Sequence, residues 1–196
     1  MLKDGEKAFP NAKVYVSEYP ELTEVTAWRA IKDYKTWSDK GKPFTTQDDP
    51  KAYGGYYTRD EVREVVQYAK ERYITVIPEI EMPGHSEEVL TVYPHLSCSG
   101  VKGVNSEFCI GNEETFVFLT DVLTEIMELF PSPYIHIGGD EAAQDAWRKC
   151  VKCQRRIKEN QLKNEDELQG YLIHRIAAFL NDNGKKLIGW DEILEG

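Results

Sequence analysis

The stretch YIHIGGDEAA, residues 134–143, places two acids directly after an apolar run and two glycines. Its first four residues are typical of a strand that is buried on both faces. Two adjacent carboxylates contribute little to folding, because like charges repel and raise the pKa of one acid. An active site can use the pair, since one acid stays ionised while its neighbour holds a proton near neutral pH. Asp140 and Glu141 are therefore our candidate catalytic residues.

The two glycines before these acids remove side chains, which allows backbone and carboxyl groups to approach a bulky ligand. A structural alternative is that Asp140 caps a helix that holds Ala142 and Trp147, with Glu141 in its first turn. That role is compatible with chemistry, but by itself it does not explain the double glycine.

Helix and strand patterns alternate on both sides of this stretch. Thr58, Asn112 and Asn164 are each followed by apolar residues at helical spacing, which predicts three helices that begin directly after these caps. Runs rich in β-branched or apolar residues predict strands at 73–77, 134–137 and 186–190. Repeated helix–strand units predict an α/β fold with a parallel sheet.

The first quarter of the sequence is less regular. Residues 14–16 are a weaker candidate strand, and 1–18 as a whole have no firm assignment. Residues 39–55 form a polar segment with Gly and Pro, of a length typical of functional or flexible loops. We expect one domain over residues 1–196.

Acids and an aromatic or imidazole group follow each predicted strand. These groups lie in the segments PEIEMPGH (78–85), HIGGDE (136–141) and GWDE (189–192). The carboxyl ends of parallel strands open on one edge, which carries the active site in (β/α)₈ barrels and the binding site in open sheets. The sequence therefore predicts a functional cleft at this edge.

These motifs resemble those of the β-N-acetylhexosaminidases of glycoside hydrolase family 20. Further motifs follow in the family order, namely YPELTE (19–24), AWR (27–29) and GGYYT (54–58), and the resemblance extends from about Tyr19 to the end of the sequence. It implies a partial (β/α)₈ TIM barrel with three to four recognisable parallel strand–helix units, as in the central part of the family's catalytic domain.

The resemblance also implies a reaction. The family removes terminal β-linked N-acetylglucosamine or N-acetylgalactosamine with retention, by a substrate-assisted route in which the 2-acetamido oxygen attacks the anomeric carbon. By the match, Glu141 protonates the leaving oxygen and later activates water. Asp140 stays ionised, orients the acetamido N–H and stabilises the positive charge that develops there.

Other residues receive roles from the same resemblance. His85 is expected to reach toward the two acids, and Trp190 to form a wall of the sugar pocket. Their structural alternatives are a loop histidine bonded to a backbone carbonyl and an ordinary core tryptophan. His136 is expected to be structural, and Glu81 stands where the family commonly has the shorter Asp. Asp191 and Glu192 are weak candidates that only cap or pair.

Parts of the family pattern are not recognisable in this sequence, including a sugar-binding Arg and a Tyr that bonds the acetamido oxygen. We therefore expect the isolated chain to have weak or no activity and to self-associate through uncovered strand edges. The resemblance implies no cofactor and a periplasmic, secreted or lysosomal parent protein, although residues 1–6 are polar and unlike a signal peptide.

The net charge of −10 disfavours nucleic acid and anionic membranes as partners. A neutral glycan that ends in a 2-acetamido sugar is compatible with it. No apolar run approaches the roughly 20 residues that span a bilayer.

The four cysteines leave several interpretations open. Cys150 and Cys153 form a CxxC, which supplies two of the four ligands of a closed zinc site, and no second CxxC or HxxxH is present. The sequence therefore predicts no metal site. A disulfide between Cys98 and Cys109 is plausible, and so are four thiols without a role.

Two other function classes remain. One is a sugar-binding or structural fragment that keeps the motifs without turnover. The other is a hydrolase that holds a divalent metal ion on Asp140, Glu141 and His85, since carboxylates and imidazole ligate metals.

Overall fold

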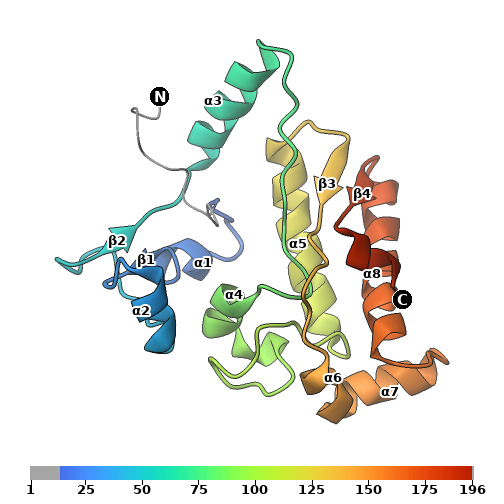
Figure 1. Ribbon diagram of the computed structural model, residues 1–196. Helices are drawn as coiled ribbons and strands as arrows, with labels where there is room; N and C mark the ends of the chain where they lie inside the picture. Colours follow the sequence, from blue (N-terminus) through green and yellow to red (C-terminus); the bar gives the residue numbers. More distant parts are fainter. Residues whose placement is uncertain (1–13, 196) are drawn as a thin grey trace. The chain divides into compact units, whose positions relative to one another are not determined.

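The computed structural model describes residues 14–195 (Figure 1). Contacts within the chain divide it into two compact units, Met1–Val65 and Val66–Gly196, which are described separately. The expectation of one domain over 1–196 stays a prediction. None of the helices in the described range has the length and apolar character required to cross a membrane.

The first unit contains short elements that the sequence pattern did not predict. They are α1 (Glu21–Glu24), β1 (Trp28–Arg29), α2 (Tyr34–Asp39) and β2 (Tyr53–Gly54). β1 and β2 pair antiparallel, with Trp28 opposite Gly54. The segment expected as a loop at 39–55 therefore ends in a strand, and the candidate strand at 14–16 is reduced to one bridge between Val14 and Tyr57.

α3 (Arg59–Lys70) spans the boundary of the two units, and its start confirms the predicted cap. The Thr58 amide donates to the Glu61 carboxylate at 2.8 Å, and the Glu61 amide donates to the Thr58 hydroxyl at 3.3 Å. This reciprocal pair satisfies two amides that the helix itself leaves without acceptors.

The second unit consists of helices around one parallel strand pair (Figure 1). Its elements are α4 (Glu87–Val92), η1 (Pro94–Leu96), α5 (Glu113–Leu129), β3 (Tyr134–His136), α6 (Asp145–Lys149), α7 (Val151–Glu159), α8 (Glu165–Asp182), β4 (Lys186–Ile188) and η2 (Asp191–Leu194). β3 and β4 pair in parallel, with Ile135 opposite Leu187, which confirms two of the predicted strands. The described chain therefore has an α/β fold with few strands, and no closed barrel is formed within the described residues.

The long helices begin where the sequence predicts. The Asn112 side chain accepts from the Glu114 amide at the start of α5, and the Asn164 side chain accepts from the Glu167 amide at the start of α8. After α8, Gly184 adopts a φ of +71°, the left-handed conformation in which helices commonly end. Apolar side chains of both helices are buried, including Leu119, Leu123, Ile126, Leu168, Leu172 and Ile176.

The predicted strand at 73–77 is wrong in its position. Pairing with β3 starts only at Pro78, whose carbonyl accepts from the His136 amide, and Glu79 lies opposite His136. In this register residues 74–76 lie opposite 131–133, which precede β3 and offer no strand to pair with. Ile74 and Ile77 are exposed rather than buried.

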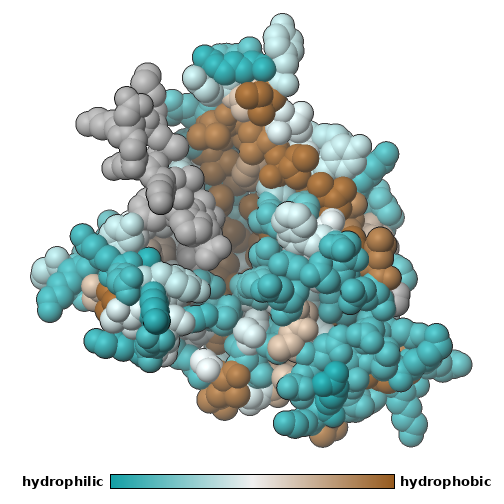
Figure 2. Space-filling model, viewed as in Figure 1, coloured by the Kyte–Doolittle hydropathy of each residue, from teal (hydrophilic) through white to brown (hydrophobic). Residues whose placement is uncertain are grey.

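Apolar side chains are exposed on one face of the second unit. Figure 2 shows hydrophobic residues in brown over the extended segment before residue 78 and over the β3–β4 pair. The exposed large side chains in these segments and in η2 are Tyr73, Ile74, Ile77, Tyr134, Trp190 and Leu194. A patch of this kind on a soluble unit marks a surface suited to further packing.

Candidate active site

The three motifs converge at the carboxyl end of β3, as the sequence predicts for parallel strands. On one side, the Met82 amide donates to the Ile137 carbonyl at 3.0 Å. On the other side, the Trp190 amide donates to the Gly138 carbonyl at 2.9 Å. The GGDE segment therefore lies between the segment that carries His85 and the segment that carries Trp190.

Two backbone positions before the acids require glycine, because Gly138 and Gly139 have φ values of +66° and +95°. A Cβ on Gly138 would lie 1.9 Å from Oε2 of Glu81, and one on Gly139 would lie 2.3 Å from Cγ2 of Ile193. The room that the glycines provide is therefore filled by the protein's own side chains. The sequence argument assigned that room to a bulky ligand instead.

His85 lies between the two adjacent acids. Its Nε2 is 3.5 Å from Oδ2 of Asp140 and 3.6 Å from Oε2 of Glu141. His85 and Glu141 both have left-handed backbones, with φ values of 50° and 49°. Such conformations cost about 1–3 kcal/mol each in non-glycine residues and are concentrated at functional sites. The two strained residues are also the two whose side chains meet at this strand end.

The helix-cap alternative for Asp140 is wrong. The next helix, α6, begins only at Asp145, and Gln144 is its cap residue. Asp140 is instead partly buried at the strand end, where Glu141 is 74% exposed. The two neighbouring acids therefore differ in their environments, one set into the protein and the other open to a ligand.

Glu81 is a further acid at this position, and its pKa is the one that the environment shifts strongly. Burial is the largest cause, and the charges of Asp140 and Glu79 add to it, so that the pKa of Glu81 rises to about 7. One carboxyl oxygen of Glu81 and one of Asp140 are buried without a hydrogen-bond partner in the described residues. Glu81 therefore binds a proton more readily than an exposed glutamate does, a property that the sequence analysis did not assign to it.

Glu79 was missed by the sequence analysis, although it precedes Glu81 by two residues and so leaves the strand on the same side. Its carboxylate accepts from the Trp190 indole N–H at 3.2 Å and lies 3.1 Å from Nδ1 of His136. The His136 and Trp190 rings meet edge to face, with centroids 5.2 Å apart. Glu79 thus orients the aromatic side of the site.

Trp190 is 49% exposed, so the alternative of a core tryptophan is wrong. His136 is half-buried, and its Nδ1 accepts from the Gly138 amide at 3.0 Å. This bond lies within the strand end and is compatible with the structural role expected for His136. The weak candidates Asp191 and Glu192 form the first turn of η2.

A small cavity of about 180 Å³ adjoins the site. Its lining includes Gly139, Glu141, Gln169 and Glu192, but not His85 or Trp190. The side-chain amide N–H of Gln169, in α8, donates a hydrogen bond to the Gly139 carbonyl at 2.8 Å. The cavity therefore lies between the acids and α8, and it does not include the side of the site that carries Trp190.

The sequence model described as "Glycosyl hydrolase family 20, catalytic domain" matches residues 8–196. Two carboxyl groups at one edge are also the arrangement that most glycoside hydrolases use. The chain belongs to glycosyl hydrolase family 20.

Individual relatives agree with this assignment. A β-hexosaminidase of Porphyromonas gingivalis is 47% identical over 89% of the chain, and one of Vibrio furnissii is 34% identical over 94%. The crystal structure of a β-N-acetylhexosaminidase from Bacteroides fragilis superposes with a TM-score of 0.76, at 36% identity over 93% of the chain. The crystal structure of a Vibrio harveyi exo-β-N-acetylglucosaminidase in complex with N-acetylglucosamine superposes with a TM-score of 0.78, at 32% identity over 94% of the chain.

The chain spans 24% and 30% of the two curated relatives and 33% and 29% of the two crystal structures. It corresponds to a part of each of these longer proteins.

Proposed function

We propose that this chain is the part of a β-N-acetylhexosaminidase that carries the general acid and the acetamido-orienting carboxylate. The observation that supports this most directly is the grouping of His85, Asp140 and Glu141 at the carboxyl end of β3. Family membership supplies the substrate class, which is a glycan with a terminal β-linked 2-acetamido sugar.

In the proposed reaction, Glu141 acts as the acid. Its exposed carboxyl gives a proton to the glycosidic oxygen while the bond to the anomeric carbon breaks. The acetamido oxygen of the same sugar forms the new bond to that carbon and yields an oxazolinium ion. Glu141, now ionised, takes a proton from water, which attacks the anomeric carbon and restores the acetamido group with retained configuration.

Asp140 is proposed to accept the acetamido N–H and to stabilise the positive charge of the oxazolinium ion. Its position beside His85, whose Nε2 is 3.5 Å from Oδ2 of Asp140, suits this role, because the imidazole helps to fix the carboxylate at the strand end. Glu81 lies next to Asp140, and its pKa of about 7 means that part of its negative charge is removed at neutral pH.

Trp190 is proposed to pack on the apolar face of the pyranose. Its ring is half exposed and is held from behind by Glu79 and by the edge of His136. An indole fixed in this way provides a flat surface that loses little rotamer freedom on binding.

The test is release of nitrophenol from nitrophenyl β-N-acetylglucosaminide, measured for the chain alone and within the longest natural reading frame that contains it. We expect turnover by the longer protein and weak or no turnover by the 196 residues alone. Binding of an oxazoline-mimicking thiazoline without hydrolysis by the longer protein would instead favour the sugar-binding, non-catalytic function.

The metal-dependent alternative has one observation in its favour. Ligand atoms of His85, Asp140 and Glu141 all lie within 4.8 Å of one another, which is close enough for one cation. A chelator that abolishes activity, with recovery on adding a divalent metal, would support it. Activity that persists in chelator supports the substrate-assisted reaction.

We also infer that the chain tested alone self-associates through the apolar face at the β3–β4 pair. In a longer family member, additional strands would cover the same face within one molecule. Light scattering on the 196-residue chain should give a mass above that of the monomer. A strictly monomeric chain would contradict this inference, and Ile74→Lys should reduce the association if this face carries it.

A further inference from the structure

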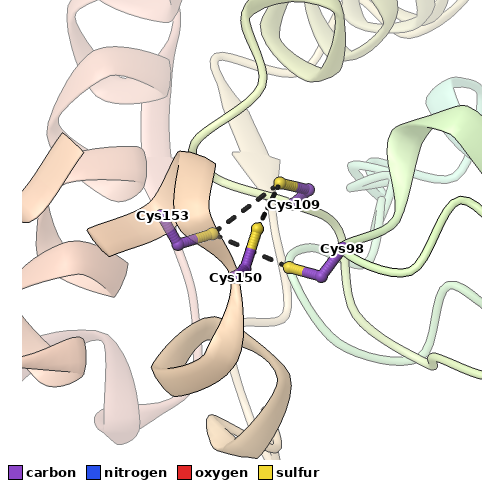
Figure 3. Close-up of side chains that lie close together, drawn as sticks. All are labelled: Cys98, Cys109, Cys150 and Cys153. Carbon is purple, nitrogen blue, oxygen red and sulfur yellow. Dashed lines mark hydrogen bonds between the residues drawn. The ribbon is translucent and has the colours of Figure 1, made fainter. Parts of the chain in front are cut away.

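The four cysteines of the chain come together in the second unit, although they are far apart in sequence (Figure 3). Cys98 follows η1 and Cys109 lies in the loop before α5. Cys150 is the cap residue of α7, and Cys153 lies in the first turn of that helix. The sulfur atoms point toward one another, as the dashed lines in Figure 3 show.

The distances between the sulfur atoms are those of a metal site. Cys109 lies 3.6 Å from Cys150 and 3.7 Å from Cys153, and Cys98 lies 3.7 Å from Cys153. All four atoms lie within 4.8 Å of one another. A tetrahedral zinc ion with Zn–S bonds of about 2.3 Å separates its sulfurs by about 3.8 Å. The cluster therefore has room for one ion at its centre.

A disulfide does not explain the cluster. A disulfide requires sulfur atoms about 2.05 Å apart, and all four cysteines are free thiols. The Cys98–Cys109 pair that the sequence suggested is not formed. An iron–sulfur cluster would place several atoms between the ligands and would need wider separations than these.

We propose that Cys98, Cys109, Cys150 and Cys153 bind a single structural zinc ion through four thiolates. Cys109 and Cys153 are fully buried, Cys150 is nearly so and Cys98 is partly exposed. With all four cysteines as ligands, a tetrahedral ion has no coordination position left for water or substrate. A closed site with four protein ligands is structural rather than catalytic.

The backbone around the cluster suits thiolate ligands. The Gly111 amide faces the sulfur atoms of Cys109 and Cys153 as a hydrogen-bond donor. Four thiolates this close need a cation, and a zinc ion supplies two positive charges at their centre.

Gly111 also permits the loop before α5 to reach the start of α7. A Cβ on Gly111 would lie 2.2 Å from the carbonyl carbon of Lys152. This close contact of two backbones brings Cys109 to the CxxC of α7. The position therefore serves the cysteine cluster.

The proposed zinc site supports both sides of the candidate active site. The loop between Cys98 and Cys109 bonds the segment that carries His85, since the Ser86 amide donates to the Ser106 carbonyl at 2.8 Å and the Phe108 amide donates to the Pro83 carbonyl at 3.0 Å. On the other side, Cys150 ends α6, which follows the two acids after a short turn. If the proposed function holds, removal of the zinc ion should also lower turnover.

The first experiment measures metal content in the longest natural protein that contains this chain, purified from cells grown with zinc. Plasma mass spectrometry should find about one zinc ion per cysteine cluster. Cys109→Ser and Cys153→Ser should lower the zinc content at least about tenfold. Lys152→Ala is the matched control, because it lies between the two cysteines of the CxxC and should keep the zinc.

A second measurement does not depend on variants that fold. Cobalt substituted into the wild-type protein should give the strong visible bands of tetrahedral Co²⁺ and intense sulfur-to-cobalt charge-transfer bands in the near ultraviolet. Zinc or cobalt that stays bound in Cys109→Ser, or an octahedral cobalt spectrum, would overturn the proposal. Iron in place of zinc, or disulfides with no bound metal, would overturn it as well.

Glu141→Gln separates this proposal from the function. This variant should keep zinc at the wild-type level whether or not the protein is a hexosaminidase. A zinc-bound but inactive wild-type protein would contradict the proposed function alone. An active protein without zinc would contradict the zinc site alone.

Discussion

The second unit holds two clusters of ionisable side chains, one at the carboxyl end of β3 and one at the start of α7. In the first, Glu141 is 74% exposed and His85 is 44% exposed. In the second, Cys109 and Cys153 are fully buried, and the Gly111 amide points at their sulfur atoms. The first, which we call the open cluster, leaves its side chains accessible to a ligand. The second, which we call the closed cluster, has most of its sulfur atoms buried. The difference in exposure therefore distinguishes a cluster that is suited to react from one that is suited to stabilise the fold.

The largest expected effect comes from Glu141→Gln, which tests the open cluster. Loss of a positioned general acid lowers kcat about 10²–10⁴-fold. The melting temperature should stay near the wild-type value, because the side chain is 74% exposed and its contact with His85, at 3.6 Å, is longer than a hydrogen bond. The measurement is kcat on nitrophenyl β-N-acetylglucosaminide together with thermal unfolding.

The matched control for this variant is Glu141→Asp, which keeps the carboxylic acid on a shorter side chain. The aspartate variant should recover part of the rate, whereas the glutamine variant should not. A glutamine variant with unchanged kcat would remove Glu141 from the chemistry.

Gly111→Ala should have the largest effect on stability, and it acts on the closed cluster. The new Cβ would lie 2.2 Å from the backbone of Lys152, and a backbone cannot move aside as the end of a side chain can. We expect a loss of about 3 kcal/mol or more in the free energy of unfolding, together with loss of bound zinc. Urea unfolding and metal analysis measure both.

Gly103→Ala serves as the control for Gly111→Ala, because no atom lies within 4 Å of its Cβ position. Its φ of +74° adds only the strain of a left-handed alanine, about 1 kcal/mol. An equal loss of unfolding free energy in the two variants would show that the close contact between Gly111 and Lys152 is not required for stability.

Gly138→Ala tests a close contact in the open cluster, and it should lower the free energy of unfolding by less than Gly111→Ala. Its Cβ would lie 1.9 Å from Oε2 of Glu81, which is the end of a side chain. The carboxyl group can shift, so we expect a loss of about 1–3 kcal/mol. Because Glu81 would move away from Asp140, kcat should also fall, whereas zinc content should not. Denaturant unfolding with parallel kinetics checks this combination.

Local signals allowed much of this arrangement to be predicted. The caps at Asn112 and Asn164 act within four residues, and each begins a helix as expected. The two acids after β3 are equally local, since they follow directly from a strand end. The sequence pattern therefore located the helices and the centre of the candidate site.

The remaining features depend on residues far apart in sequence. The pairing of Glu79 with His136 fixes where the first predicted strand becomes ordered, and no property of 73–77 reveals that register. The raised pKa of Glu81 comes from burial and from Asp140. Cys98 and Cys153 meet across 55 positions, so that spacing motifs, which consider neighbours, find only half of the ligand set.

The smallest expected effect is a pH dependence of stability that Glu81→Gln should remove. The pKa of Glu81 is about 7 in the folded chain and near 4.5 when the chain is unfolded. The folded chain therefore binds the proton more tightly, so this stabilisation is complete below about pH 4.5 and is lost as the pH rises through 7. Screening by solvent at this half-buried carboxyl reduces the effect to the order of 1 kcal/mol.

The amide of the Gln variant resembles the protonated acid and does not titrate. The difference in unfolding free energy between variant and wild type should therefore grow in favour of the variant from about pH 5 to about pH 7.5. Other titrating groups are shared by both proteins and cancel in this difference. A difference in unfolding free energy that is constant with pH would contradict the raised pKa of Glu81. Glu81 would then be a charged neighbour of Asp140 at neutral pH.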